Sequence, residues 1–277
     1  MAETLDAGLL EQLQEARALA GADLTGADLS RFDLYRVSLT KAALPHANLA
    51  GGRLTGTDLS QANLSGANLA GADLRGANLS SANLTDTDLT GAFLQRADLR
   101  SANLSEARLE NIQLDLALYN THTSWPDPFR YRSSGALGPG ASLNGAYLNT
   151  AHLRGVDLTG ARLLGAYLSG TDLTKATLDN VSFSSANLQK AFLTGASLRN
   201  ARFSGTELQG ADLRATNLTG ADFSGVFSIA GADFSLAYGL SDAARAQLLS
   251  RPATELDVWN AFTRSTTRRS LEHPDSD

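Results

Sequence analysis

A five-residue repeat runs through most of this chain and constrains its fold more than any other feature. From Leu24 to Leu114 a leucine stands at every fifth position, nineteen times in succession. The same spacing runs from Leu143 to Phe223 over seventeen further positions, where phenylalanine sometimes replaces leucine. A small residue, usually Ala, stands two places before the apolar residue, and Asp or Asn most often lies between them.

A period of five fits neither of the regular backbone structures. Side chains return to one face of a helix after about 3.6 residues and to one face of a strand after about two. Short repeats sustained over such a length predict a solenoid, in which each unit buries its apolar side by stacking on its neighbours. Two apolar positions in each repeat require a corner in each repeat, so four repeats close a square coil of about twenty residues.

The side chains suit such a coil. The large Leu or Phe and the small residue before it point inward, while Thr, Ser, Gly, Arg, Asp and Asn occupy the other positions. Gly, Asn and Asp suit tight corners because they tolerate unusual backbone angles and bond to their own backbone. We expect stacked coils to hydrogen-bond like parallel strands, with a spacing of about 4.8 Å.

The A-(D/N)-L-x-x pattern, as in Ala77-Asn78-Leu79, resembles the pentapeptide repeat family. The resemblance covers roughly residues 21–240. It implies an all-β solenoid, the right-handed quadrilateral β-helix of that family. Because one fold hosts many roles, the resemblance constrains the architecture much more than the function.

The repeat predicts one elongated body made of five segments. Its ends are a capping helix in residues 1–20, where leucines recur at helical spacing, and a C-terminal segment in residues 241–277 with helices and a polar tail. Between these ends lie a first repeat block, an insertion rich in aromatic residues and proline, and a second repeat block, at residues 21–119, 120–140 and 141–240 respectively. Beyond the second block's last regular repeat the frame slips.

The insertion has two interpretations that the residues leave open. In one, Trp125 and Phe129 pack back against the edge of a coil and anchor a loop that leaves and re-enters the stack. In the other, the insertion is a recognition loop with Arg130, Tyr131 and Arg132 at its exposed tip. Long irregular insertions on a rigid scaffold often contact a binding partner. In the recognition-loop interpretation, the insertion would therefore bind a protein.

Two helices are predicted after the last repeat. Ser241 and Asp242 form a helix N-cap signature before an apolar run that ends at Pro252. A second short helix is expected to open at Thr254, and residues 266–277 are polar and expected to fray.

The second helix is expected to carry Leu256, Trp259 and Phe262, which form a sizeable apolar face. Two interpretations of this face remain. The helices cap the open edge of the last coil, or they form a homodimer interface. A C-terminal helical segment makes such a dimer in the gyrase-protecting branch of the family, so the resemblance implies the homodimer interface.

Tyr35 and Phe93 replace small or polar residues at outward positions and are further candidates for protein binding. We expect them to share a face about three coils apart, since about twenty residues make one coil. Ordinary surface variation is the alternative. Arg31, Arg36 and Lys41 recur at successive repeats, so they form a basic collar around one coil and not a patch.

The sequence offers no catalytic, cofactor-binding or metal-binding constellation. The four histidines are far apart, and no pair has the spacing of metal ligands. Asp alternates with Asn before the core leucines, which favours turn capping over a calcium ladder, because a metal site needs several oxygens at one point. The chain has no cysteine and therefore no thiol chemistry. We expect a protein that is not an enzyme and has no cofactor.

Charge and hydropathy limit the partners and the cellular compartments that are expected for this protein. The net charge is −6, and residues 21–119 hold eleven acids against eight bases. This field is too diffuse for direct contact with nucleic acid to be expected. Neither a basic leader with an apolar run nor an apolar stretch of membrane-spanning length is present, so we expect a soluble protein of the bacterial cytoplasm without membrane contact.

Two functions follow as hypotheses. The first is a rigid interaction scaffold whose protein partner the sequence does not identify. The second, implied by the family resemblance, is a DNA mimic that occupies the DNA-binding saddle of a type II topoisomerase such as gyrase and relieves quinolone poisoning. The acidic N-terminal half would imitate phosphates, although the basic collar interrupts it. Mimicry predicts binding that weakens steeply with salt.

Overall fold

The computed structural model describes residues 19–273, and the chain divides into two compact units, Met1–Leu137 and Gly138–Asp277. Of the capping helix predicted for residues 1–20, residues 1–18 lie outside the described part, and Leu19 and Ala20 are not helical. The boundary between the units lies in the insertion, where the five-residue frame is lost.

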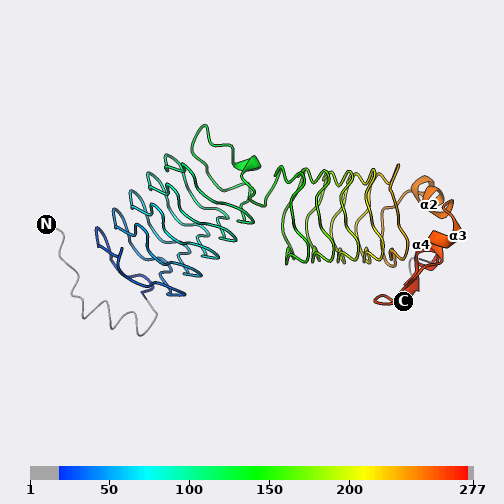
Figure 1. Cartoon of the computed structure of the whole chain (residues 1–277), viewed down its shortest axis with the longest axis horizontal. Coiled ribbons are helices and arrows are strands. Elements are labelled where there is room, and N and C mark those ends of the chain that lie inside the picture. The colour runs from blue at the N-terminus through cyan, green and yellow to red at the C-terminus, as the bar shows by residue number, and fades with distance from the viewer. Residues whose placement is uncertain (1–18, 274–277) are drawn as a thin grey trace. The chain divides into compact units, whose positions relative to one another are not determined.

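Each unit is a stack of coils that are joined by parallel bridges (Figure 1). In unit 1, Asp23, Asp28, Asp33 and Ser38 each bridge to the residue twenty positions later, so a coil makes one bridge on each of four sides. Unit 2 repeats the pattern. The bridges are single residues and not strands of several residues, because a corner follows each bridge at once.

The corners are tight turns. The Ala27 amide donates to the Leu24 carbonyl at 3.0 Å, and Gly26 between them has a φ of 67°. A bond between the first and fourth residues with a positive φ at the third is the type II turn, which favours glycine at that place. Ser81 and Asn111 adopt the same left-handed conformation at other corners, with φ near 58°.

The core is a column of apolar side chains inside each stack of coils. Leu79 and its equivalents are completely buried, and Phe183, Phe203 and Phe223 stack on one another in successive coils of unit 2. Buried threonines at the small position donate their hydroxyls to backbone carbonyls, in most cases of the previous coil, as Thr57 does to Leu34 at 2.6 Å. The polar groups inside the coil are therefore satisfied.

The Asp and Asn residues that precede the core leucines cap the corners, as predicted. The Thr25 amide donates to a carboxylate oxygen of Asp23 at 3.1 Å, and the same contact recurs around both units. Asn78 also donates its side-chain amide to Asp58, one coil earlier, at 3.1 Å. These side chains therefore join the corner within a coil to the stacking between coils.

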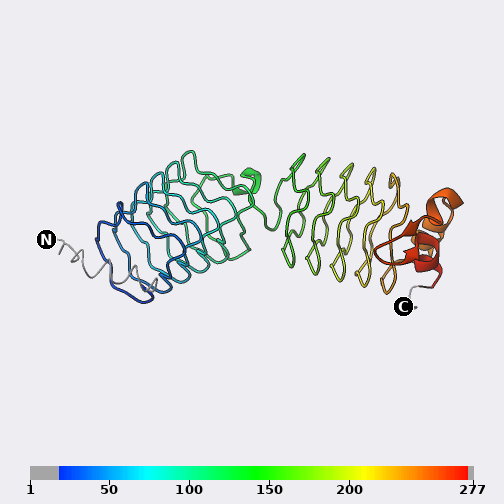
Figure 2. The ribbon, with the colours of Figure 1, turned by 60° about the horizontal axis from the view of Figure 1, so that its bottom comes forward.

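Unit 2 ends in a small mixed subdomain, shown beside the last coils in Figures 1 and 2. It contains α2 (Asp242–Leu249), α3 (Ala253–Leu256), the antiparallel pair β1 (Trp259–Asn260) and β2 (Ser265–Thr266), and α4 (Thr267–Glu272). The remaining named element is a 3-10 turn, η1 (Tyr131–Ser133), in unit 1. The slipped frame that precedes the subdomain is confirmed by bridges that span twenty-one residues, such as Glu207 to Ser228.

The predicted first helix is confirmed, since the Ser241 side chain accepts a bond from the Ala244 amide at the start of α2. The predicted second short helix is confirmed in α3, which carries Leu256. Its extension to Trp259 and Phe262 was wrong, because α3 has only four residues and Trp259 lies in β1. The prediction that residues 266–277 fray was also wrong for α4, where Ser270 and Leu271 are buried against the rest of the subdomain.

Replacement of Leu79 by Asp should unfold the repeat core of unit 1. The side chain is completely buried, so the variant places a carboxylate without a partner in a dry column, at a cost of at least about 4 kcal/mol. Ser81→Asp is the control, because Ser81 is exposed at a corner that tolerates Asp. Thermal unfolding followed by circular dichroism should show a large loss for the first variant only. Equal stability of the two variants would contradict the buried position of Leu79.

Candidate functional site

The C-terminal subdomain closes the last coil of unit 2 with side chains. One coil earlier, the Leu208 and Leu213 amides donate to backbone carbonyls of the following coil at 2.9 Å. The equivalent Ile229 amide instead donates to the Glu255 carboxylate at 2.5 Å. The Phe234 amide likewise donates to the Ser270 hydroxyl at 3.1 Å. Side-chain oxygens therefore replace the carbonyls of an absent next coil.

The same subdomain satisfies carbonyls of the last coil. The Thr267 hydroxyl donates to the Ile229 carbonyl at 2.9 Å. Arg251 donates to the carbonyls of Val226 and Phe227 and also pairs with Glu255. An open coil edge would expose a row of unpaired backbone groups, which invites association with other chains. These contacts satisfy the backbone groups of the last coil that they reach, so those groups are not available to other chains.

Asn260 fixes the turn between β1 and β2 against the coils. Its side-chain amide donates to the Gly231 carbonyl at 2.8 Å, and its oxygen accepts from the Phe262 and Thr263 amides at 3.0 and 3.2 Å. Asn260 itself is buried. One side chain therefore sets both the shape of the turn and its position on the solenoid.

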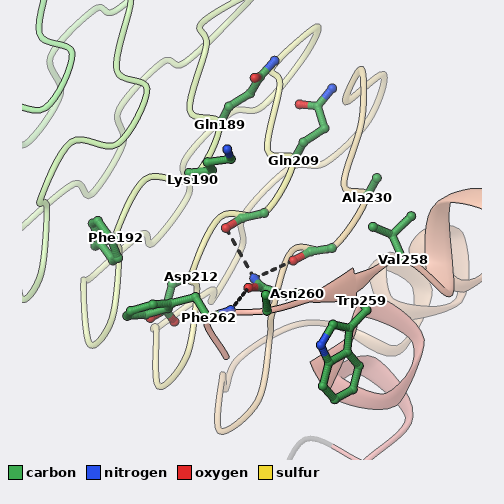
Figure 3. A pocket seen from close by; sticks show the side chains of 13 residues that line it. Gln189, Lys190, Phe192, Gln209, Asp212, Ala230, Val258, Trp259, Asn260 and Phe262 are labelled. Atoms are coloured by element: carbon green, nitrogen blue, oxygen red, sulfur yellow. Dashed lines mark hydrogen bonds between the residues drawn. The ribbon is translucent and has the colours of Figure 1, made fainter. Parts of the chain in front are cut away.

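The pinned turn and the coil corners enclose a hollow of about 690 Å³ (Figure 3). Phe192 and Phe262 lie together on one side of it, with ring centroids 5.2 Å apart in an edge-to-face arrangement. Val258 and Trp259 lie on the other side, and the coil corner at Gly210 contributes part of the wall. The volume falls in the range of ligand-binding pockets, about 300–1,000 Å³.

A second hollow of about 560 Å³ adjoins the first and shares Phe192 and Phe262 with it. It is lined by His152, Asp172 and Thr174 on the coil side. We call the two hollows together the cap groove. The groove lies entirely within unit 2.

The two carboxylates of the cap groove are held by different groups. Asp212, whose side chain is only 3% exposed, pairs with Arg214 at 2.8 Å. The Thr174 side chain is the main cause that lowers the pKa of Asp172, and the positive charge of Arg154 lowers it further. Lys190, in contrast, is exposed and makes no ion pair within the described part of the chain. The uncompensated charge of the first hollow is therefore positive.

The insertion of unit 1 forms a compact aromatic cluster. Trp125 stacks on Tyr131 at 5.3 Å and on Phe129 at 5.6 Å, and Tyr119 meets Trp125 edge to face at 6.0 Å. Trp125 and Phe129 are half-buried, as the anchoring interpretation expects. Tyr131 does not lie at an exposed tip, because its ring is held against Trp125.

Arg130 and Arg132 on either side of Tyr131 are exposed, and the Arg132 guanidinium lies 5.6 Å from the Tyr131 ring. These two arginines are the part of the predicted recognition loop that remains accessible.

The outward aromatic residues of unit 1 lie in different surroundings. Tyr35 is half-buried between Arg36 and Arg53, whose guanidinium groups are 5.1 and 4.7 Å from its ring. Phe93 is 37% exposed and lies two coils beyond Arg53 in the same column of bridges. The two residues thus lie along the same side of unit 1, but arginine side chains cover Tyr35.

The C-terminal candidates separate into two roles. Leu256 is completely buried under the last coil, whereas Trp259 and Phe262 are 58% and 64% exposed at the cap groove. Phe192 and Lys190 were not predicted as site residues. Phe192 could have been found, because it replaces the usual Asp or Asn before a core leucine in the same way as Phe93.

The titratable groups that line the cap groove are Lys190, His152, Asp172 and Asp212. Among residues 19–273 no cluster of three or more His, Asp or Glu side chains could hold a metal ion. Asp172 accepts hydrogen bonds from the amide and the side chain of Thr174, which is the contact of a coil corner. Over the same residues, no helix has the length and apolar character needed to cross a bilayer.

Stacked coils with a five-residue period define the class of short-repeat solenoids. The model of pentapeptide repeats matches the chain in eight copies, over residues 19–56, 44–80, 77–114, 140–174, 162–200 and 196–235. These ranges cover more than half of the chain. The protein therefore belongs to the pentapeptide repeat family.

Several solved structures are similar to the chain. HetL, which is involved in heterocyst differentiation regulation in the cyanobacterium Nostoc sp. strain PCC 7120, is 32% identical over 79% of this chain and 84% of its own, with a TM-score of 0.32. QnrB1, a plasmid-mediated fluoroquinolone resistance protein, is 19% identical over 84% of this chain and 96% of its own, with a TM-score of 0.35. A pentapeptide repeat protein of the Arabidopsis thaliana thylakoid lumen is 25% identical over 72% of this chain and 89% of its own, with a TM-score of 0.16. No curated protein matches the chain.

Replacement of Glu255 by Gln should loosen the cap in a pH-dependent way. Burial raises the pKa of Glu255, but bonds from Arg251 and the Ile229 amide outweigh it, so the pKa lies below its usual 4.5. The ionised carboxylate therefore stabilises the fold above pH 4.5, and this contribution is lost as the pH falls through the folded pKa. We expect Glu255→Gln to cost about 1–2 kcal/mol at neutral pH, with a smaller difference from the parent protein in acid.

Urea unfolding at neutral pH and at about pH 3 measures both differences. Thr254→Gln is a control, since Thr254 is exposed in the same helix. A destabilisation by Glu255→Gln that stays constant across the pH range would contradict the role of the charge.

Proposed function

We propose that this protein is a non-enzymatic interaction scaffold, built on a right-handed quadrilateral β-helix, that holds a protein partner at the cap groove. The exposure of Trp259 and Phe262 on a turn fixed by Asn260 carries this proposal. Large aromatic side chains that remain exposed beside a hollow are typical of contact surfaces. A bacterial cytoplasmic setting is consistent with a chain that contains no cysteine.

Rigidity supports this role. Binding is weakened by the entropy lost when loops and side chains become ordered, so a preformed surface binds more tightly than a mobile one of equal area. The bonds from Asn260 and the ring contact of Phe262 with Phe192 hold the turn before a partner arrives. The solenoid below supplies a frame in which each coil is bonded to the next.

The alternative is a DNA mimic that binds DNA gyrase or another type II topoisomerase. The acidic excess of residues 21–119 favours it. Several of the carboxylates in this block, however, are neutralised by arginine. Arg75 holds the pKa of Asp73 at about 2 through a two-point contact, and Asp33, Asp88 and Asp98 also have arginine partners. Paired charges imitate phosphates poorly, so we favour the scaffold.

Phe262→Ser should abolish capture of the partner. We would compare proteins retained by the tagged full chain from extracts of its native cells, using quantitative mass spectrometry. Phe227→Ser is the matched control, because Phe227 is 66% exposed in the same unit and does not line the groove. A partner enriched by the parent protein and by Phe227→Ser should fall at least about tenfold with Phe262→Ser. Equal capture by both variants would contradict a partner site at the groove.

A DNA gyrase supercoiling and cleavage assay with a quinolone separates the two functions. We expect both readouts to stay unchanged when this protein is present well above the enzyme concentration, at low and at moderate salt. Protection that fades as salt rises would instead support mimicry by the acidic block, because screening weakens interactions between charges. The same preparation, analysed by light scattering, shows whether the chain forms a homodimer through its C-terminal subdomain.

A further inference from the structure

We propose that the cap groove binds an extended peptide segment of the partner in which an apolar side chain stands next to a carboxylate. This inference rests on the proposed function and specifies the chemistry that the groove recognises. Three observations carry it: the shape of the two hollows, the aromatic residues between them and the charge that remains uncompensated.

The shape favours an extended chain over a compact ligand. The two hollows lie side by side along one column of coil corners that includes Gly170, Lys190, Gly210 and Gly231. Counted from Thr150, the first corner of this column, the groove spans four coil steps. At about 4.8 Å a step this is roughly 19 Å, the length of about six extended residues. A single small molecule would fill only one of the hollows.

The aromatic residues favour an apolar side chain near the middle of the segment. Phe192 and Phe262 belong to both hollows, so a peptide that follows the groove passes them. Val258 and Trp259 face them across the first hollow (Figure 3). Burial of one large apolar side chain here would contribute roughly 1.5–3 kcal/mol.

The charges favour a carboxylate beside that side chain. Lys190 lines the first hollow and forms no ion pair with any described residue, whereas Asp212 is paired with Arg214. In the second hollow the Thr174 side chain is the main group that lowers the pKa of Asp172, and the charges of Arg154 and His152 lower it further. In the first hollow a basic peptide would therefore meet an ion-paired carboxylate and the ammonium group of Lys190, which is an unfavourable pairing.

Selection from a random twelve-residue peptide library on phage tests this chemistry with the full chain as bait. Phage that also bind the Phe262→Ser variant are removed before each round. We expect the surviving peptides to share an aromatic or large aliphatic residue with Asp or Glu at a neighbouring position. Peptides enriched in Lys or Arg at that position would overturn the proposal, as would the failure of any peptide to survive the removal step.

The best peptide, synthesised with a fluorophore, then tests the role of Lys190 by anisotropy. Lys190→Glu should weaken its binding at least tenfold, since reversing the charge replaces an attraction by a repulsion. Lys175→Glu should leave binding within about twofold, because Lys175 is an exposed corner residue with a similar φ, 59° against 55°, and does not line the groove. Equal binding by the two variants would overturn the proposal.

The two proposals fail in different ways. If the peptide results contradict the proposed chemistry while capture of a cellular partner still depends on Phe262, the scaffold stands and the peptide motif is wrong. If capture is unaffected by Phe262→Ser, the scaffold site itself is wrong. Melting temperatures of Lys190→Glu and Lys175→Glu that match the parent protein ensure that binding, and not folding, is compared.

Discussion

The structure depends on one recurring interaction, the hydrogen bond from the amide of a core leucine to a carbonyl of the next coil. The Leu79 amide, for example, donates to the Asp98 carbonyl at 2.8 Å. The bond is buried beside the leucine side chain, so stacking satisfies the backbone and removes apolar surface from water in one step. A coil alone would do neither, and the stability of each coil therefore comes from its neighbours. The corners, the Asp and Asn caps and the buried threonines all serve this stacking.

Such a stack has an end, and the end explains the cap groove. Ile229 and Phe234 present amides for which no further coil exists, and Glu255 and Ser270 accept them. The subdomain that supplies these side chains extends beyond the coil edge. Its turn, held by Asn260, rests against the outer corners and leaves the hollows beneath Phe262. The interaction surface that we propose is thus a consequence of how the solenoid is closed.

Much of the fold could be predicted from the sequence because the repeat is periodic and its contacts are local in the coil. The leucine column, the Asx caps and the N-cap of α2 at Ser241 each follow from residues a few places apart. The extension of the second helix to Phe262 and the frayed tail were predicted wrongly, because the structure after Leu256 depends on contacts across 26 to 50 residues, such as Glu255 to Ile229 and Asn260 to Gly210. No local pattern in the sequence predicts those contacts. The cap groove could not be predicted for the same reason, because it brings Phe192 and Phe262 together from distant parts of the chain. The unusual position of Phe192 in its repeat did, however, mark it as a candidate site residue.

Amide hydrogen exchange, resolved by NMR, tests the central claim that side chains close the last coil. The amides of Ile229 and Phe234 should be protected nearly as well as those of Leu208 and Leu213, which bond to backbone carbonyls one coil earlier. Protection within about tenfold of those amides is the predicted result, since local opening of the cap would be needed for exchange. Exchange of Ile229 and Phe234 at the rate of an unstructured peptide, with Leu208 and Leu213 still protected, would contradict it.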